Sequence, residues 1–171
     1  MSAVAAQPIP ARRLTLVTLP PEYADEMAAV LADPDLYTFT GGSPPARQEL
    51  RARYERWNAG SPDPGVSWCN WVIKLRSPRC LTGTVQATIS SGDESLAEVA
   101  WVVGTAWQGQ GIATEAAQAL IAWLGHQSVH TTIAHIHPRH QASAAVAAAA
   151  GLTPTGQLED GEMRWRLRMT P

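Results

Sequence analysis

The chain has 171 residues with 15 acidic and 13 basic side chains, which gives a net charge of −2 and a pI near 6.2. This length favours one domain, and a hydrophobic content of 45% is enough for a packed core. The charge gives no reason to expect a nucleic-acid or a membrane partner. Cys69 and Cys80 lack metal-ligand spacing, and no long apolar segment occurs, so we expect a cytoplasmic protein with free thiols.

The N-terminal third predicts one strand followed by two helices. Residues 1–11 hold Pro8 and Pro10 and little that could pack, so we expect a flexible leader before a domain spanning 12–171. Alternating apolar residues predict a strand over 14–19. Apolar residues at helical spacing predict helices over 22–32 and 46–58.

The rest of the chain predicts a sheet with two further helices. Strands are expected at 68–76, 81–89, 98–103 and 131–137, helices at 113–124 and 141–151, and a hairpin at Asp160-Gly161. The order of elements is strand, two helices, three strands, helix, strand, helix and two strands. This order indicates an α+β or α/β fold with a mixed, mostly antiparallel sheet.

A glycine loop follows the strand at 98–103 and opens the helix at 113. Such a loop offers unpaired N–H groups and the positive end of a helix dipole, so it is suited to phosphate oxygens. A Walker loop would need a lysine directly after Gly111, and the chain has isoleucine there. A dinucleotide fingerprint would need a small third residue and an acidic end to the next strand, but Thr114 and histidines occupy these places.

A third interpretation fits the spacing. Gln108, Gly111 and Ala113 form the pattern Gln/Arg-x-x-Gly-x-Gly/Ala, which resembles the acetyl-CoA signature of the GNAT N-acetyltransferase superfamily. Residues 98–103 resemble that family's fourth strand, 133–138 its fifth strand and 141–152 its fourth helix. The family's Asn-x-x-Ser and Gly-Phe become His140-x-x-Ser143 and Gly151-Leu152. The N-terminal half resembles, in its order of elements, the branch that includes ribosomal-protein N-acetyltransferases.

The resemblance implies a single-domain acyl-CoA N-acyltransferase fold whose fourth and fifth strands are parallel and splay apart. The gap would expose backbone groups that pair with the pantetheine arm of CoA along 101–103. It implies acetyl-CoA as co-substrate, no metal, and a cofactor site made of Trp101, Val102, Val103, Gln108, Gly109, Gln110, Gly111, Ile112, Ala113, Thr114, His140 and Ser143.

The chemistry implied by the resemblance needs a base for the amine and a donor to the thioester carbonyl. Glu98 matches the strand position where some GNAT enzymes carry a basic glutamate, and the Val103 N–H is the expected donor. The tyrosine that protonates the thiolate in many members is replaced by Ala148, so water, His140 or Ser143 would take its place. Tyr37, Trp68 and Trp71 are expected to border the acceptor.

The histidine run at 135–140 is interpreted as strand and loop histidines with ordinary hydrogen bonds, because no carboxylate lies in the same segment. The sequence thus predicts transfer of acetyl to a primary amine of a small molecule, a peptide or a protein N-terminus, by direct attack in a ternary complex. The oligomeric state is expected to be monomer or homodimer. The alternatives are a catalytically impaired CoA sensor or scaffold and, more distantly, a nucleotide-binding module.

Overall fold

The computed structural model describes residues 3–170, and its centre is one eight-stranded sheet in the order β1-β2-β3-β4-β5-β6-β8-β7. Within these residues, β5–β6 is the only parallel pair of strands. The strands are β1 (Ile9–Pro10), β2 (Leu14–Thr18), β3 (Val66–Leu75), β4 (Leu81–Ser90), β5 (Leu96–Val103), β6 (Thr131–Ile136), β7 (Thr153–Glu159) and β8 (Glu162–Arg168). The predicted mixed, mostly antiparallel α+β fold is confirmed, including the hairpin, where Asp160 and Gly161 both have positive φ.

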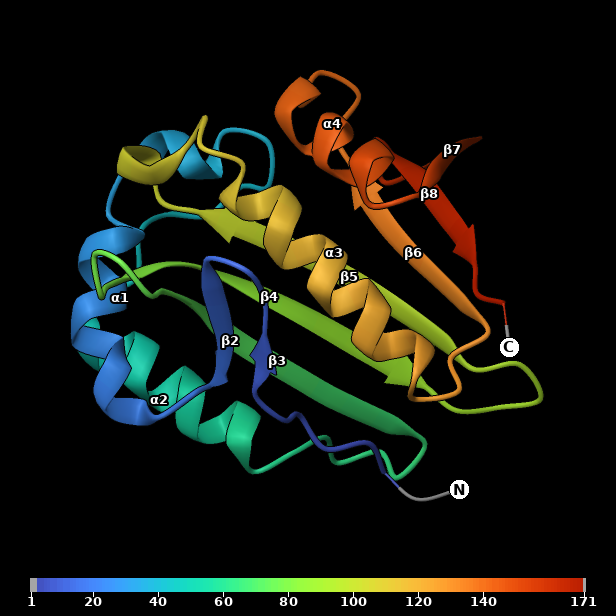
Figure 1. Cartoon of the computed structure of the whole chain (residues 1–171), viewed down its shortest axis with the longest axis horizontal. Coiled ribbons are helices and arrows are strands. Elements are labelled where there is room, and N and C mark those ends of the chain that lie inside the picture. The colour runs from blue at the N-terminus through green and yellow to red at the C-terminus, as the bar shows by residue number, and fades with distance from the viewer. Residues whose placement is uncertain (1–2, 171) are drawn as a thin grey trace.

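Helices cover both faces of this sheet (Figure 1). They are α1 (Ala24–Val30), α2 (Arg47–Asn58), α3 (Ile112–Gly125) and α4 (Gln141–Ala149), with short 3₁₀ turns at Pro21–Tyr23, Pro34–Tyr37 and Thr105–Trp107. One core lies under α3 and contains Trp71 and Leu120; the other lies under α1 and α2 and contains Val72 and Tyr54. Neighbouring β3 residues therefore serve opposite layers, as the two-residue period of a strand requires.

Small residues let α3 lie close to the sheet. Ala116 and Ala117 are buried in its first turns, and Leu120 and Leu124 are fully buried further along. Burying each leucine stabilises the fold by about 2 kcal/mol. The helix is thereby fixed over β5 with its N-terminus at the open end of the sheet, as Figure 1 shows.

The parallel strands β5 and β6 separate part of the way along their length. Their registered pairs run from Leu96–Thr131 to Glu98–Ile133 and then stop, although β5 continues to Val103 and β6 to Ile136. In Figure 1 the two strands lie together at one end and diverge toward the other. The predicted splay of these strands is confirmed.

The N-terminal segment is docked on the sheet, in contrast to the flexible leader predicted for 1–11. Ile9 and Pro10 pair with β2, and Ile9 is buried. The Val4 N–H donates to Ser67 Oγ at 2.9 Å, and the Trp71 indole N–H donates to the Gln7 carbonyl at 2.8 Å. The prediction failed because a run rich in alanine and proline still offers backbone groups and small apolar side chains. Residues 1–2 of the predicted leader lie outside the described residues.

Deleting residues 1–8 is expected to lower the free energy of unfolding by about 1–3 kcal/mol, because a buried indole loses its acceptor and apolar contacts are lost. The urea midpoint measures this. Gln7→Ala is the matched control and should stay within about 0.5 kcal/mol of wild type, since Trp71 uses the backbone carbonyl. An unchanged midpoint for the truncated chain would restore the interpretation of a free leader.

Candidate active site

The predicted phosphate loop lies at the N-terminus of α3. Gly109 and Gly111 have φ values of 76° and 77°, which glycine adopts without strain, and Gly111 is the N-cap of the helix. No side chain caps this end, and the first helical hydrogen bond runs from the Glu115 N–H to the Gly111 carbonyl. The N–H groups of 112–114 are therefore available for an anion.

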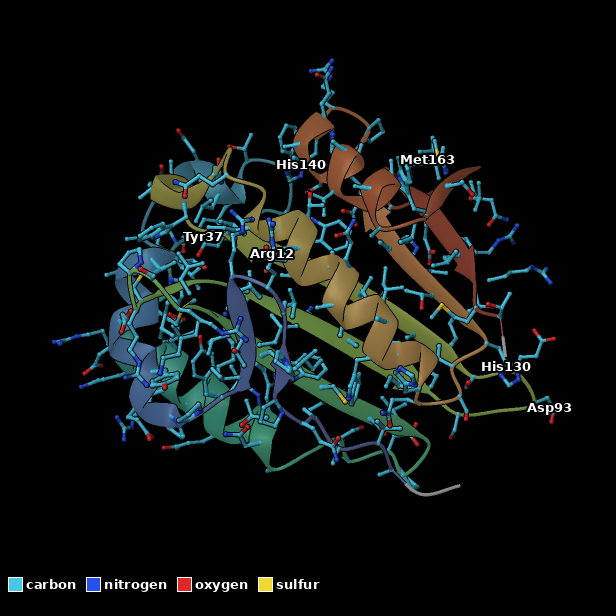
Figure 2. All side chains as sticks on the ribbon, in the orientation of Figure 1. Arg12, Tyr37, Asp93, His130, His140 and Met163 are labelled. Atoms are coloured by element: carbon cyan, nitrogen blue, oxygen red, sulfur yellow. The ribbon has the colours of Figure 1, made fainter. Side chains whose placement is uncertain are left out.

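Arg13 holds this loop from behind, a role that the sequence did not indicate. Its guanidinium Nε and its backbone N–H each donate to the Glu115 carboxylate at 2.7 Å. Its Nη1 donates to the Gln110 carbonyl at 2.9 Å. A Cβ on Gly111 would lie 3.3 Å from Arg13 Nη2. Figure 2 shows the neighbouring Arg12 beside the start of α3. The β1–β2 corner thus fixes the loop, and it leaves little room for a side chain at 111.

The Arg13 contacts also change the acidity of Glu115. Partial burial raises the pKa of this carboxyl, but the hydrogen bonds and charge of Arg13 outweigh burial, so the pKa lies below its usual value. The ionised form is therefore the one that the folded loop favours.

Unpaired backbone groups of β5 face the gap between β5 and β6. The Gly104 N–H donates to the Thr82 carbonyl on the β4 side, whereas the Ser95 carbonyl accepts from the Thr131 N–H on the β6 side. Because backbone direction alternates along a strand, the N–H groups of Trp101 and Val103 point into the gap. The Val103 carbonyl already accepts from Gln108 Nε2 at 3.0 Å. This hydrogen bond ties the first residue of the motif to the end of β5.

Glu98 belongs to a three-residue chain of hydrogen bonds at the point where the strands part. Its Oε1 lies 2.5 Å from His135 Nδ1, and the other ring nitrogen lies 3.1 Å from Glu159 Oε2. Two carboxylates can both accept from one imidazole only when both ring nitrogens carry protons. The sequence interpretation of His135 as an ordinary strand histidine missed this arrangement, because the carboxylates come from β5 and β7.

A cavity of about 180 Å³ lies between the α1–α2 layer and the floor formed by β3, β4 and β5. Tyr37 lines it, as do Tyr54, Trp57, Asn70, Gln86, Ala100 and Val102. Ala100 and Val102 lie on the same face of β5 as Glu98, so the cavity and the carboxylate share one side of the sheet. A larger open cavity beside Lys74 and Arg79 lies at β2 and β3, away from the gap.

The three residues expected to border the acceptor have different positions. Tyr37 lines the cavity and donates its hydroxyl to the Leu31 carbonyl at 3.0 Å. Trp68 is half-buried and does not line it. Trp71 is fully buried in the α3 core with its ring edge-to-face against Trp123. Trp71 is also among the residues that line the cavity, although the strand period turns its side chain to the opposite face of the sheet, so its contact with an acceptor stays a prediction.

The loop after Pro34–Tyr37 crosses the open end of the gap. The Phe39 ring lies 4.7 Å from the His140 ring and 5.0 Å from the His137 ring, and it stacks on the former. His140 Nε2 is 3.3 Å from Ser143 Oγ. Burial lowers the pKa of His140, and His137 lowers it further. Figure 2 shows Tyr37 and His140 at the same end of the molecule, near the start of α3.

Comparison with known proteins identifies the class of this site. A family model described as an acetyltransferase (GNAT) domain matches residues 13–153. Similar solved structures include a GNAT-family acetyltransferase from Bacillus anthracis, with 18% identity, 95% of this chain and 99% of that chain covered, and a TM-score of 0.80. A ribosomal-protein-S5-alanine acetyltransferase from Vibrio fischeri has 16% identity and a TM-score of 0.81, with 95% of this chain and 97% of that chain covered. The microcin C7 self-immunity acetyltransferase MccE, solved with acetyl-CoA and AMP, has 18% identity and a TM-score of 0.77, with 91% of this chain and 92% of that chain covered. No curated protein matches the sequence.

The chain belongs to the GNAT acetyltransferase family, and it is an acyltransferase. This confirms the resemblance inferred from Gln108, Gly111 and Ala113. Within residues 3–170, no three His, Cys, Asp or Glu side chains are grouped as metal ligands. None of the helices in that range has the length and apolar character needed to span a bilayer.

Glu115→Gln is expected to destabilise the fold at neutral pH by about 1 kcal/mol, a decrease in Tm of about 3 °C. Because the folded-state pKa of Glu115 is lowered, its contribution is present above the unfolded pKa and is lost as the pH falls through the folded value. The Tm difference should therefore shrink below about pH 4. Glu55→Gln, at an exposed pair with Arg51, is the control and should change Tm little at either pH. A pH-independent difference would contradict this account.

Proposed function

We propose that the protein transfers acetyl from acetyl-CoA to a primary amine by direct attack in a ternary complex. The observation that carries this proposal is the arrangement along β5. One strand has Glu98 where it leaves β6, a row of unpaired N–H groups beyond it, and the phosphate loop immediately after its end. The donor would bind in the gap beside this strand, and the acceptor would reach it from the face that carries Glu98.

The donor is proposed to bind along this path from loop to strand. The pyrophosphate would accept from the N–H groups of the loop and first helical turn, with the two glycines allowing close approach. The pantetheine amides would pair with the backbone of Trp101 and Val103 like a short extra strand. His140 and Ser143, at the start of α4, would border the same arm from the β6 side.

The spacing along β5 favours the Trp101 N–H over the Val103 N–H as the donor to the reacting carbonyl. Glu98 and Val103 are five residues apart, about 17 Å of extended strand, whereas Glu98 and Trp101 are about 10 Å apart. The Glu98 side chain and the acceptor amine together can bridge the shorter distance, from Glu98 to the carbonyl held by the Trp101 N–H. Val103 would then contact the pantetheine arm.

Glu98 is proposed as the base, directly or through one water molecule. The amine nitrogen forms a bond with the acetyl carbon, its proton passes to Glu98, and the C–S bond breaks. His135 links Glu98 to the exposed Glu159, so its doubly protonated ring would give the Nε2 proton to Glu159 before it takes a proton from Glu98 at Nδ1. Ala148 provides no acid for the thiolate, but a thiol pKa not far above neutrality lets CoA leave and take a proton from water.

The replacement of the family's tyrosine by Ala148 also favours a second candidate, a CoA-binding sensor or scaffold that has lost catalysis. Both candidates require the donor site. They differ in whether a free thiol is released when acetyl-CoA and an amine are supplied together.

Gly111→Glu is expected to lower acetyl-CoA affinity at least about 100-fold, because a carboxylate would occupy the anion position and meet Arg13. Calorimetric titration measures the affinity. Gly60→Glu is the matched control, since Gly60 also has a positive φ, 90°, but lies in open space after α2. Wild-type affinity in the Gly111 variant would refute the pyrophosphate assignment.

Glu98→Gln is expected to reduce turnover about 10²- to 10⁴-fold with acetyl-CoA affinity unchanged, because the variant keeps the shape and loses the base. Release of free CoA thiol across an amine panel is the readout. Glu94→Gln, in the exposed β4–β5 turn, serves as the control. If the wild-type protein binds acetyl-CoA but releases no thiol with any amine of the panel, the result would support the sensor instead.

A further inference from the structure

One residue on the sheet-facing side of α2 is charged. Leu50, Arg53, Tyr54 and Trp57 follow the spacing of a single helix face, and Leu50 and Tyr54 are buried. A position in such a stripe is ordinarily apolar. Arg53 instead lines the cavity with Tyr54 and Trp57.

The Arg53 guanidinium is oriented but lacks an anionic partner in the part of the chain described. Its Cζ lies 5.9 Å from the centre of the Trp57 ring, a cation–π arrangement. The ion pairs found within 3–170 do not include Arg53, and no residue that lines the cavity carries a carboxylate. A planar cation held this way matches a carboxylate in two-point geometry.

A second polar group in the same cavity is unpartnered. Tyr54 is only 1% exposed, and its hydroxyl has no hydrogen-bond partner within the described structure. Burial raises the pKa of Tyr54 to about 12, so the group remains a neutral donor. A buried hydroxyl without a partner is unusual and indicates a site whose ligand supplies the acceptor.

The size of the cavity limits the ligand. A cavity volume of about 180 Å³ is well below the 300–1,000 Å³ usual for drug-sized ligands. The lining has no anion to bind a polyamine and one cation to repel it. A large polycationic acceptor is therefore disfavoured on both volume and charge.

We propose that the acceptor is a small α-amino acid or a close analogue whose carboxylate is bound by Arg53 and Tyr54. This inference rests on the proposed transferase function. The carboxylate would lie under α2, which directs the amine toward Ala100 and Glu98 on the β5 floor. The amine nitrogen is then acetylated: it bonds to the acetyl carbon and loses one proton, and the CoA thiolate leaves. A protein N-terminus, with a neutral amide in place of the carboxylate, would leave Arg53 unpaired.

The experiment compares free L-phenylalanine, L-leucine and L-methionine with their carboxamides, which keep the amine and remove the anion. Kinetics are followed by thiol release, and binding to the CoA-loaded protein by tryptophan fluorescence. Wild type is expected to show KM and Kd at least 10-fold lower for one or more acids than for the matched amides. Amides that equal or surpass every acid would overturn the inference.

Arg53→Met keeps the side-chain stem and removes the charge. It should raise KM for the acids at least 10-fold, change the values for amides less than threefold and leave acetyl-CoA affinity unchanged. Arg56→Met, one turn further along on the exposed side of α2, is the matched control and should behave as wild type. Retention of full acid preference by the Arg53 variant would overturn the inference.

Tyr54→Phe keeps the test decisive if Arg53→Met fails to fold. The hydroxyl has no partner in the free protein, so its removal breaks no internal hydrogen bond, and KM for the acids should still rise. The binding arm separates the two proposals. Saturable binding of acids but not amides, lost in the variants, supports the acceptor class even if no thiol is released, whereas absence of acid binding to the wild type overturns it.

Discussion

The divergence of β5 from β6 is the constraint on which the rest of the site depends. Three registered residue pairs hold the two strands together, and pairing between the strands stops after Glu98 and Ile133. Backbone N–H groups left without a partner carry a free-energy cost in a closed sheet, but here they point into a gap at the start of α3. The same divergence leaves Glu98 exposed and His135 partly exposed, so the proposed acetyl-CoA binding and proton transfer would both depend on one interruption in the sheet.

Two segments of the N-terminal half, the β1–β2 corner and α2, build the surroundings of this gap. The β1–β2 corner supplies Arg13, which fixes the phosphate loop through the Gln110 carbonyl and Glu115. The α2 helix supplies the roof of the cavity on the opposite face. The proposed donor and acceptor sites therefore lie on opposite faces of the sheet, and both include residues of β5.

The sequence predicted the elements and the glycine loop before α3 because these depend on local rules. Alternation and helical spacing located the strands and helices, and Gln108, Gly111 and Ala113 lie in the predicted loop at the start of α3. Contacts between distant segments were not predictable: Arg13 with Glu115, and His135 with Glu98 and Glu159, join residues that only the sheet order brings together. Trp71 shows a similar limit, because periodicity gives two faces and does not say which one holds the cavity. Arg53 had a usable signal, a charge within an apolar helix stripe.

The stacking of Phe39 on His140 connects the halves of the molecule at the open end of the gap. His140 begins the helix that would flank the donor, whereas Phe39 belongs to the segment that follows Tyr37 at the cavity wall. Movement of the β6–α4 turn would disturb this ring pair and, through it, the segment beside the cavity wall. A single aromatic contact thus spans the proposed donor and acceptor sides of the molecule.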